Sequence, residues 1–232
     1  MLQTLILCRS YGSNSAHFIS DMCIHSDYQS LLAQGIAVFA PNIRGSAGFG
    51  KAFMNLDNGP LRVNAIRDVK DTADYLVKTG FADPKRLGIM GGSYGGYMTM
   101  AALSTYPGLF AAGVDMYGIV NFETFFKNTE GWMAAVSKME YGDPETQAAL
   151  LRSLSPINHV ETIKTPTMIL HGDHDTNVPL GEARQMASAL EKNGVPVQLV
   201  IFPGEGHGWN QTSTRIRSNL LVVQWFHKYL QQ

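Results

Sequence analysis

Short runs of apolar residues alternate with longer segments of helical periodicity along the whole chain. The runs are continuous rather than alternating in polarity, which is typical of strands that are buried on both faces of a sheet. They predict strands at Thr4–Cys8, Ile36–Asn42, Arg86–Met90, Ala111–Gly118, Thr165–Gly172 and Val197–Gly204. The helical periodicity predicts helices at Arg67–Thr79, Tyr97–Tyr106, Leu180–Asn193 and Thr212–Leu230. We therefore expect an α/β fold, with a mainly parallel sheet and helices on both faces.

Two segments add detail to this pattern. The last predicted helix has an apolar stripe, spaced three to four residues apart, that is formed by Ile216, Leu220, Val223 and Phe226. Residues 121–160 break the alternation, because they are aromatic and helical in character and long for a connection. We expect this segment to be a helical insertion over one end of the sheet, within a single domain formed by residues 1–232.

The composition excludes some classes of partner. The chain has 232 residues, of which 45% are hydrophobic and 16% charged, as in ordinary globular proteins. Its formal net charge is -1, and its 18 Lys and Arg residues are scattered. Because no basic field attracts phosphates, we expect neither nucleic acid nor a membrane surface as a partner.

The N-terminal region and the cysteines bear on location. Cys8 and Cys23 are the two cysteines, too few for a disulfide scaffold, and free thiols are the expectation. The apolar run Leu5–Cys8 has no basic segment before it and is shorter than the apolar core of a signal peptide. It predicts a strand, and we expect a cytoplasmic protein.

The stretch GGSYGGYM contains Ser93 in a G-x-S-x-G pattern, directly after the third predicted strand. A serine on a tight turn from strand to helix has a strained backbone and an exposed Oγ. Gly91 and Gly95 meet the need for small residues where strand and helix nearly touch. The pattern predicts Ser93 as a nucleophile and the backbone N–H of Tyr94 as an oxyanion donor. A glycine-rich turn with a capping serine, or a phosphate-cradling loop, is the alternative.

The stretch HGDHDTNVP follows the fifth predicted strand. Its two carboxylates and two imidazoles raise the question of a metal site, but no second cluster of ligands completes a shell. We therefore expect no metal, and no other cofactor. One of the two aspartates, Asp173 or Asp175, is then expected to orient a catalytic histidine; alternatively both only cap the turn before the next helix.

The stretch FPGEGHGW follows the sixth predicted strand and places His207 between two glycines. A serine, an acid and a histidine that follow different parallel strands, in this order, match the order of the α/β-hydrolases. The carboxyl ends of such strands lie at one edge of the sheet. His207 is expected to accept the Ser93 proton, and the acid to hold the imidazole tautomer.

With these stretches, the sequence resembles the catalytic domain of the prolyl oligopeptidase family of serine peptidases, and it is most similar to the acylaminoacyl-peptidase and dipeptidyl-peptidase branches. The likeness is carried by APNIRGSAGFG, GGSYGGYM, SPINHV, HGDHDTNVP and EGHGW, in the family's order, from Gln34 to Trp209. The resemblance implies an α/β-hydrolase fold with Ser93 as nucleophile, His207 as base and Asp175, rather than Asp173, as acid.

The chain also departs from the family pattern. Family members usually carry HGGP after the first of these strands, where this chain has LCRSYGSNS. The resemblance suggests the Tyr11 hydroxyl as a second oxyanion donor in its place. The first strands of a full hydrolase sheet and the β-propeller of the family are missing from these residues, which leaves about six strands.

Other residues have expected roles near the site. Arg44 either meets a substrate carbonyl or carboxylate or, as we favour, pins its own loop. In the insertion, Phe125, Phe126, Trp132 and Met133 either line an apolar side-chain pocket or pack the insertion on the domain, and both roles are compatible. Trp209 is expected to pack under the histidine loop.

We expect a serine hydrolase that cleaves peptide or N-acyl-aminoacyl bonds through an acyl-enzyme. A carboxylesterase that acts on small esters is one alternative, because the site lacks a propeller. A non-catalytic hydrolase-like binding domain or fragment is another, because HGGP is missing. A homo-oligomer is also expected, because the missing strands expose a sheet edge.

Overall fold

The structure, a computed structural model, describes residues 2–9 and 26–231. At its centre is a six-stranded sheet in the order β2-β1-β3-β4-β5-β6, in which all neighbouring strands are parallel. The strands are β1 (Leu2–Arg9), β2 (Ile36–Phe39), β3 (Ala82–Gly92), β4 (Ala112–Met116), β5 (Thr167–Gly172) and β6 (Val197–Phe202). Each predicted strand is present, and the α/β fold class is confirmed.

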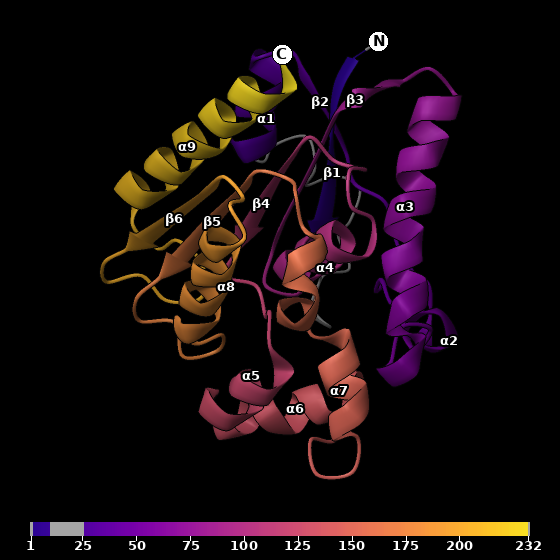
Figure 1. Cartoon of the computed structure of the whole chain (residues 1–232), viewed down its shortest axis with the longest axis vertical. Helices are drawn as coiled ribbons and strands as arrows, with labels where there is room; N and C mark the ends of the chain where they lie inside the picture. The colour runs from indigo at the N-terminus through magenta and orange to yellow at the C-terminus, as the bar shows by residue number, and fades with distance from the viewer. Residues whose placement is uncertain (1, 10–25, 232) are drawn as a thin grey trace.

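Helices cover both faces of the sheet (Figure 1). One face carries α1 (Ser26–Ala33) and α9 (Thr212–Leu230); the other carries α3 (Arg62–Lys78), α4 (Tyr94–Thr105) and α8 (Gly181–Lys192). Neighbouring strand residues therefore enter different apolar clusters. On β5, Ile169 packs in the cluster under α3, α4 and α8, whereas Met168 and Leu170 pack in the cluster under α9. This two-sided burial explains why the strands are continuous apolar runs.

The apolar stripe expected on α9 is buried only in part, because Phe226 is buried and Val223 half-buried but the other two residues face outward. Ile216 and Leu220 are 57% and 56% exposed. The buried face of the helix is formed by Thr214, Ser218, Val222, Trp225, Phe226 and Leu230. Val222, Trp225 and Leu230 thus complete the buried face in place of Ile216 and Leu220. In the part of the chain that the structure describes, no helix is long and apolar enough to cross a membrane.

The interrupting segment is helical, as the sequence predicts. It forms α5 (Phe122–Asn128), α6 (Gly131–Tyr141), α7 (Ala148–Leu154) and the 3-10 segment η2 (Pro156–Thr162). In Figure 1, α5, α6 and α7 lie together below the sheet, beyond the ends of β4 and β5. The buried carboxylate of Glu182 in α8 anchors the start of this segment, because it accepts the backbone N–H groups of Val120 at 3.0 Å and Asn121 at 2.8 Å.

The order of the strands determines where a site can form. The chain passes from β1 outward to β2 at the edge of the sheet, through α2 (Lys51–Met54) and η1 (Gly59–Leu61) to α3, and then returns to β3 on the other side of β1. The direction of winding thus changes between β1 and β3. Sites in open parallel sheets lie outside the carboxyl ends of the strands at this point, and the residue that follows β3 is Ser93.

Candidate active site

Ser93 occupies the single position between the end of β3 and the start of α4. Its backbone has φ 56° and ψ -120°, in a region that residues with a side chain rarely adopt. The N–H of Ser93 donates to the carbonyl of Met116 at the end of β4, at 2.9 Å. This is the strained strand-to-helix turn that the G-x-S-x-G pattern predicts.

The turn is closely packed against the next strand. A Cβ on Gly96 would lie 2.3 Å from Asp115 Oδ1 and 2.7 Å from the Cα of Gly118, and one on Gly92 would lie 2.9 Å from the Tyr117 hydroxyl. The sequence already indicates that Gly96 gives room at this turn, and Gly92 adds a further position that requires a small residue. A side chain at either position would collide with neighbouring atoms, so the chain can follow this path around Ser93 only with glycine there.

A continuous line of hydrogen bonds joins three residues that are far apart in the sequence. The Oγ of Ser93 lies 2.7 Å from His207 Nε2, and His207 Nδ1 lies 2.8 Å from Asp175 Oδ2. The side chain of Asp175 is fully buried, whereas that of His207 is 21% exposed at the edge of the site. A buried carboxylate, an imidazole and a serine hydroxyl in this order can activate the hydroxyl as a nucleophile.

The two aspartates of HGDHD have different surroundings. Asp175 reaches His207, whereas Asp173 Oδ1 accepts the N–H of Gly204 at 2.7 Å and lies 3.3 Å from Nδ1 of the exposed His174. Asp175 is therefore the aspartate that can orient the histidine. Within the described residues, no group of three or more His, Cys, Asp and Glu side chains is arranged to hold a metal ion.

A hydrogen-bonded turn holds the Asp175 carboxylate. Its Oδ1 accepts the N–H groups of Asn177 at 3.0 Å and Val178 at 2.9 Å, which leaves Oδ2 for the histidine. The buried imidazole of His171 in turn binds the carbonyl of Val178 through Nε2, at 2.8 Å. These bonds fix both the position and the rotation of the carboxylate.

The loop that carries His207 is held by Glu205, which sequence reasoning did not single out. The buried Glu205 carboxylate accepts the N–H groups of Asn210 at 2.8 Å and Gln211 at 3.1 Å, before the first turn of α9. Its carbonyl accepts the N–H of His174 at 2.9 Å, which joins the histidine loop to the aspartate loop. Desolvation raises the pKa of Glu205, but the hydrogen bonds to its carboxylate outweigh it, so that the pKa is lowered from its ordinary value.

Aromatic side chains pack around His207. Tyr117, which directly follows β4, has a positive φ of 43° and packs edge-on against the imidazole, with ring centroids 4.9 Å apart. Trp209 packs edge-on against both Tyr117, at 5.2 Å, and Phe202, at 4.7 Å. The predicted packing of Trp209 near the histidine loop is confirmed. Tyr117 was not predicted, although an aromatic residue at the carboxyl end of a strand was a signal for it.

A buried arginine lies beneath the residue that follows the nucleophile. Arg62, which is fully buried, donates to the Asp57 carboxylate and to the Tyr94 hydroxyl, and the Tyr94 hydroxyl donates to Asp57 at 2.8 Å. Its guanidinium lies 4.8 Å from the ring centroids of both Tyr94 and Tyr141. Burial raises the pKa of the Tyr94 phenol well above its ordinary value, so the phenol stays neutral. The cluster joins α3, the start of α4 and α6.

Tyr94 also begins α4, so its backbone N–H is among the first four of the helix and has no intrahelical acceptor. This location supports its predicted role as an oxyanion donor. Tyr11, the predicted second donor, lies outside the described residues.

The other predicted site residues differ in their surroundings: one is paired, one is buried and one is exposed. The guanidinium of Arg44 pairs with the Asp68 carboxylate through Nε, at 2.9 and 3.0 Å, and Nη2 donates to the carbonyl of Asn64. These contacts match the favoured interpretation, in which Arg44 pins its own loop. Phe125 is 1% exposed and packs in the core, whereas Trp132 is 59% exposed on α6.

The model of the prolyl oligopeptidase family matches residues 24–232 of the chain. The chain belongs to this family. The dipeptidyl aminopeptidase BIII of Pseudoxanthomonas mexicana is 38% identical over 186 residues, which are 78% of this chain and 27% of that protein. The acylamino-acid-releasing enzyme of Arabidopsis thaliana is 29% identical over 220 residues, which are 92% of this chain and 29% of that protein.

Solved structures agree with this assignment to the prolyl oligopeptidase family. A puromycin-hydrolyzing peptidase of Mycobacterium tuberculosis has a TM-score of 0.91 and 26% identity, and the match covers 99% of this chain and 34% of that one. An acylaminoacyl peptidase bound to a Z-Gly-Gly-Phe chloromethyl ketone has a TM-score of 0.85 and 25% identity, over 99% and 37%. The family resemblance and the α/β-hydrolase fold expected from the sequence are confirmed. The chain spans roughly a third of these proteins.

Proposed function

We propose that this chain is the hydrolase domain of a serine peptidase that cleaves peptide or N-acyl-aminoacyl bonds through an acyl-enzyme. The observation that carries the proposal is the line of hydrogen bonds from Ser93 Oγ through His207 to Asp175, with distances of 2.7 and 2.8 Å. The names of the relatives, a dipeptidyl aminopeptidase and an acylamino-acid-releasing enzyme, support the choice of substrate class.

The first half of the proposed reaction forms an ester on the enzyme. Ser93 Oγ attacks the substrate carbonyl carbon while its proton moves to His207 Nε2. The Asp175 carboxylate, 2.8 Å from His207 Nδ1, stabilises the imidazolium that forms. The C–N bond then breaks, and the leaving amine takes the proton from His207.

The second half releases the acid. A water molecule gives a proton to His207 Nε2 and attacks the ester carbonyl, and Ser93 Oγ leaves with the proton that His207 returns. In both halves the negative carbonyl oxygen needs donors, and we assign one to the backbone N–H of Tyr94. Tyr11 is retained as the proposed second donor.

Aromatic residues of the insertion are candidates for the wall of a substrate pocket. Phe122, Phe125 and Phe126 form a packed group with ring centroids 5.3 to 6.5 Å apart, next to Tyr97. Phe122 and Phe125 are buried in the core, so the half-buried Phe126 is the member of this group that can reach a substrate, where it would favour an apolar side chain. The exposed Trp132 remains a proposed contact of a longer substrate, and Arg44 a weaker one because its guanidinium is already paired.

Assays with three substrate types test the proposal. We expect turnover of aminoacyl or N-acetyl-aminoacyl p-nitroanilides as well as p-nitrophenyl esters. Ser93→Ala should lower kcat by about 10⁴- to 10⁶-fold, because no other group replaces the nucleophile. Turnover of esters alone would make the protein a carboxylesterase, and no turnover of any substrate would favour the non-catalytic binding domain.

Location and assembly are further proposals. We place the protein in the cytoplasm, with peptides, acyl-amino acids or esters as its partners, and we propose that it forms a homo-oligomer. Phe39, on the edge strand β2, is 38% exposed, which supports contact at this edge. Sedimentation at micromolar concentration tests the assembly, and a single monomer peak would contradict it.

A further inference from the structure

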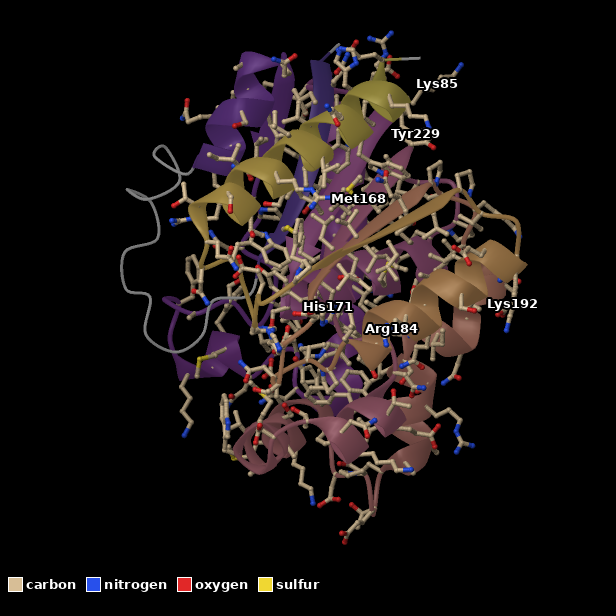
Figure 2. The ribbon with its side chains drawn as sticks, turned by 90° about the vertical axis from the view of Figure 1, so that its left-hand side faces the viewer. Lys85, Met168, His171, Arg184, Lys192 and Tyr229 are labelled. Carbon is tan, nitrogen blue, oxygen red and sulfur yellow. The ribbon has the colours of Figure 1, made fainter. Side chains whose placement is uncertain are left out.

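His171 is a buried imidazole next to the proposed acid, and the proposed reaction does not use it. It is the fifth residue of β5, and its side chain is fully buried. Figure 2 shows it further along the strand than Met168, toward the end of the sheet where the helices α5 to α7 lie. A histidine in this position can fill space in the core, gain or lose a proton, or orient a neighbouring group through a hydrogen bond.

The hydrogen bonds of His171 fix its tautomer. Its Nε2 lies 2.8 Å from the carbonyl oxygen of Val178. A carbonyl oxygen only accepts, so Nε2 carries the hydrogen. Among the described residues, Nδ1 is buried with no hydrogen-bond partner. A second proton on Nδ1 would therefore be a buried N–H without an acceptor, and burial lowers the pKa of His171 from its ordinary value, although Asp175 acts in the other direction.

The Val178 carbonyl belongs to the turn that holds the acid. Val178 donates its N–H to Asp175 Oδ1 at 2.9 Å, and its carbonyl accepts from His171. The same Nε2 lies 3.6 Å from Asp175 Oδ2, the oxygen that binds His207. His171 thus closes the turn through the Val178 carbonyl and places a neutral N–H group, rather than a full charge, near the carboxylate.

We propose that His171 is a positioning residue, which holds the turn of residues 175–178 so that Asp175 Oδ2 is directed at His207. This inference rests on the proposed function. A neutral donor suits the role, because a cation beside Asp175 would compete with His207 for the carboxylate. The titratable groups that act on His171 are Asp175 and His207.

Two variants separate the hydrogen bond from the space that the side chain fills. His171→Leu has a similar volume and no donor, whereas the amide nitrogen of His171→Gln can reach the Val178 carbonyl as Nε2 does. We expect His171→Leu to lower kcat about 10- to 100-fold with KM changed less than about 2-fold, and His171→Gln to recover most of the loss. His159→Leu removes a histidine bond to the carbonyl of Ser153 at an exposed site, and serves as the control without effect.

The pH profile distinguishes positioning from folding. Without a directed carboxylate the protonated form of His207 is less stable, so the acidic limb of kcat/KM in His171→Leu should move to lower pH. The hydrogen on His207 Nδ1 gives a second readout, because its low-field proton resonance needs no substrate. We expect it in the unchanged protein and in His171→Gln, and we expect it displaced upfield in His171→Leu.

Three outcomes would overturn the inference: equal kcat in His171→Leu and the unchanged protein, equal loss in the Leu and Gln variants, or lower stability of the Leu variant with an unmoved pH limb and proton resonance. Absence of turnover in the unchanged protein would instead overturn the proposed function. In that case the proton resonance alone still decides the role of His171.

Discussion

The turn that carries Ser93 and the loop that carries His207 meet at one hydrogen bond, but different forces hold them in place. The serine turn is held by close packing: Gly96 and Gly118 nearly touch, Asp115 lies between them, and the Ser93 backbone is strained at φ 56°. The histidine loop is held by hydrogen bonds, most of which converge on Glu205. One half of the site therefore depends on glycines that leave no room for a side chain, and the other on hydrogen bonds to a carboxylate.

Packing at Ser93 and hydrogen bonding at His207 match the chemical roles of the two residues. A nucleophile must present one oxygen at a fixed point, and rigid packing provides this. A base must exchange a proton and then give it back, so it needs partners that respond to charge. We expect added volume to disturb the serine turn most, and removal of the Glu205 charge to disturb the histidine loop.

The largest expected effect is steric. Gly96→Ala should destabilise the protein by about 3 kcal/mol, because its Cβ would lie 2.3 Å from Asp115 Oδ1 and 2.7 Å from the Cα of Gly118. Gly131→Ala is the matched control, since a Cβ at this helical position meets nothing within 4 Å. Urea unfolding measures both. Equal stability of the two variants would contradict the packing of the serine turn.

The histidine loop also has a close steric contact with the end of β5. A Cβ on Gly172 would lie 2.3 Å from the carbonyl oxygen of Glu205, whereas one on Gly206 meets its nearest neighbour at 3.8 Å. Gly172→Ala should therefore cost about 2 to 3 kcal/mol of stability, and Gly206→Ala much less. If thermal unfolding ranked them in the opposite order, the account of this loop would be wrong.

The next effect is a pH dependence at Asp115. This buried carboxyl accepts the N–H of Gly118 at 2.9 Å, and burial raises its pKa to about 7. Stability from this group is complete below the ordinary Asp pKa and is lost as the pH rises through about 7. Asp115→Asn does not titrate, so its stability relative to the unchanged protein should rise by about 2 to 3 kcal/mol between pH 5 and pH 9. A constant difference over this range would contradict the prediction.

Glu205 should show the opposite sign. Its pKa is lowered, so its stabilising contribution is present above the ordinary Glu pKa and is lost as the pH falls. Glu205→Gln removes the charge from two hydrogen bonds, and we expect a loss of about 1 kcal/mol at pH 7 that disappears toward pH 3. Chemical unfolding at several pH values measures the difference in unfolding free energy between the variant and the unchanged protein. A difference that grows as the pH falls would contradict the prediction.

The smallest effect concerns backbone strain. Ser93→Gly should be about 1 kcal/mol more stable than Ser93→Ala, because glycine adopts a positive φ without a steric penalty. Both variants lack the nucleophile, so the comparison isolates the backbone. If Ser93→Ala were the more stable of the two variants, the backbone at position 93 would not be strained.

Much of this arrangement could be predicted from the sequence. Continuous apolar runs give all six strands because the sheet is covered on both faces. The positions of Ser93 and His207 after such runs then bring them to one edge. The choice of Asp175 needed the family resemblance, since Asp173 lies two residues away and only the turn of residues 175–178 determines which carboxylate meets the histidine.

Other features could not be predicted because they depend on packing in three dimensions. Polarity places Arg62 at a surface, but its guanidinium is paired with Asp57 and lies 4.8 Å from the ring centroids of both Tyr94 and Tyr141. Likewise, the apolar side chains of Ile216 and Leu220 are exposed, whereas Thr214 and Ser218 of the same helix are buried. In both cases close contacts with distant segments, rather than local pattern, decide burial.

The central claim is that His207 activates Ser93. Labelling with a fluorophosphonate, followed by peptide mass spectrometry, tests it most directly. We predict that the label is found on Ser93, that Ser93→Ala is unlabelled, and that His207→Ala is labelled at least about 10³-fold more slowly. Labelling of a different serine, or equal rates with and without His207, would contradict the account.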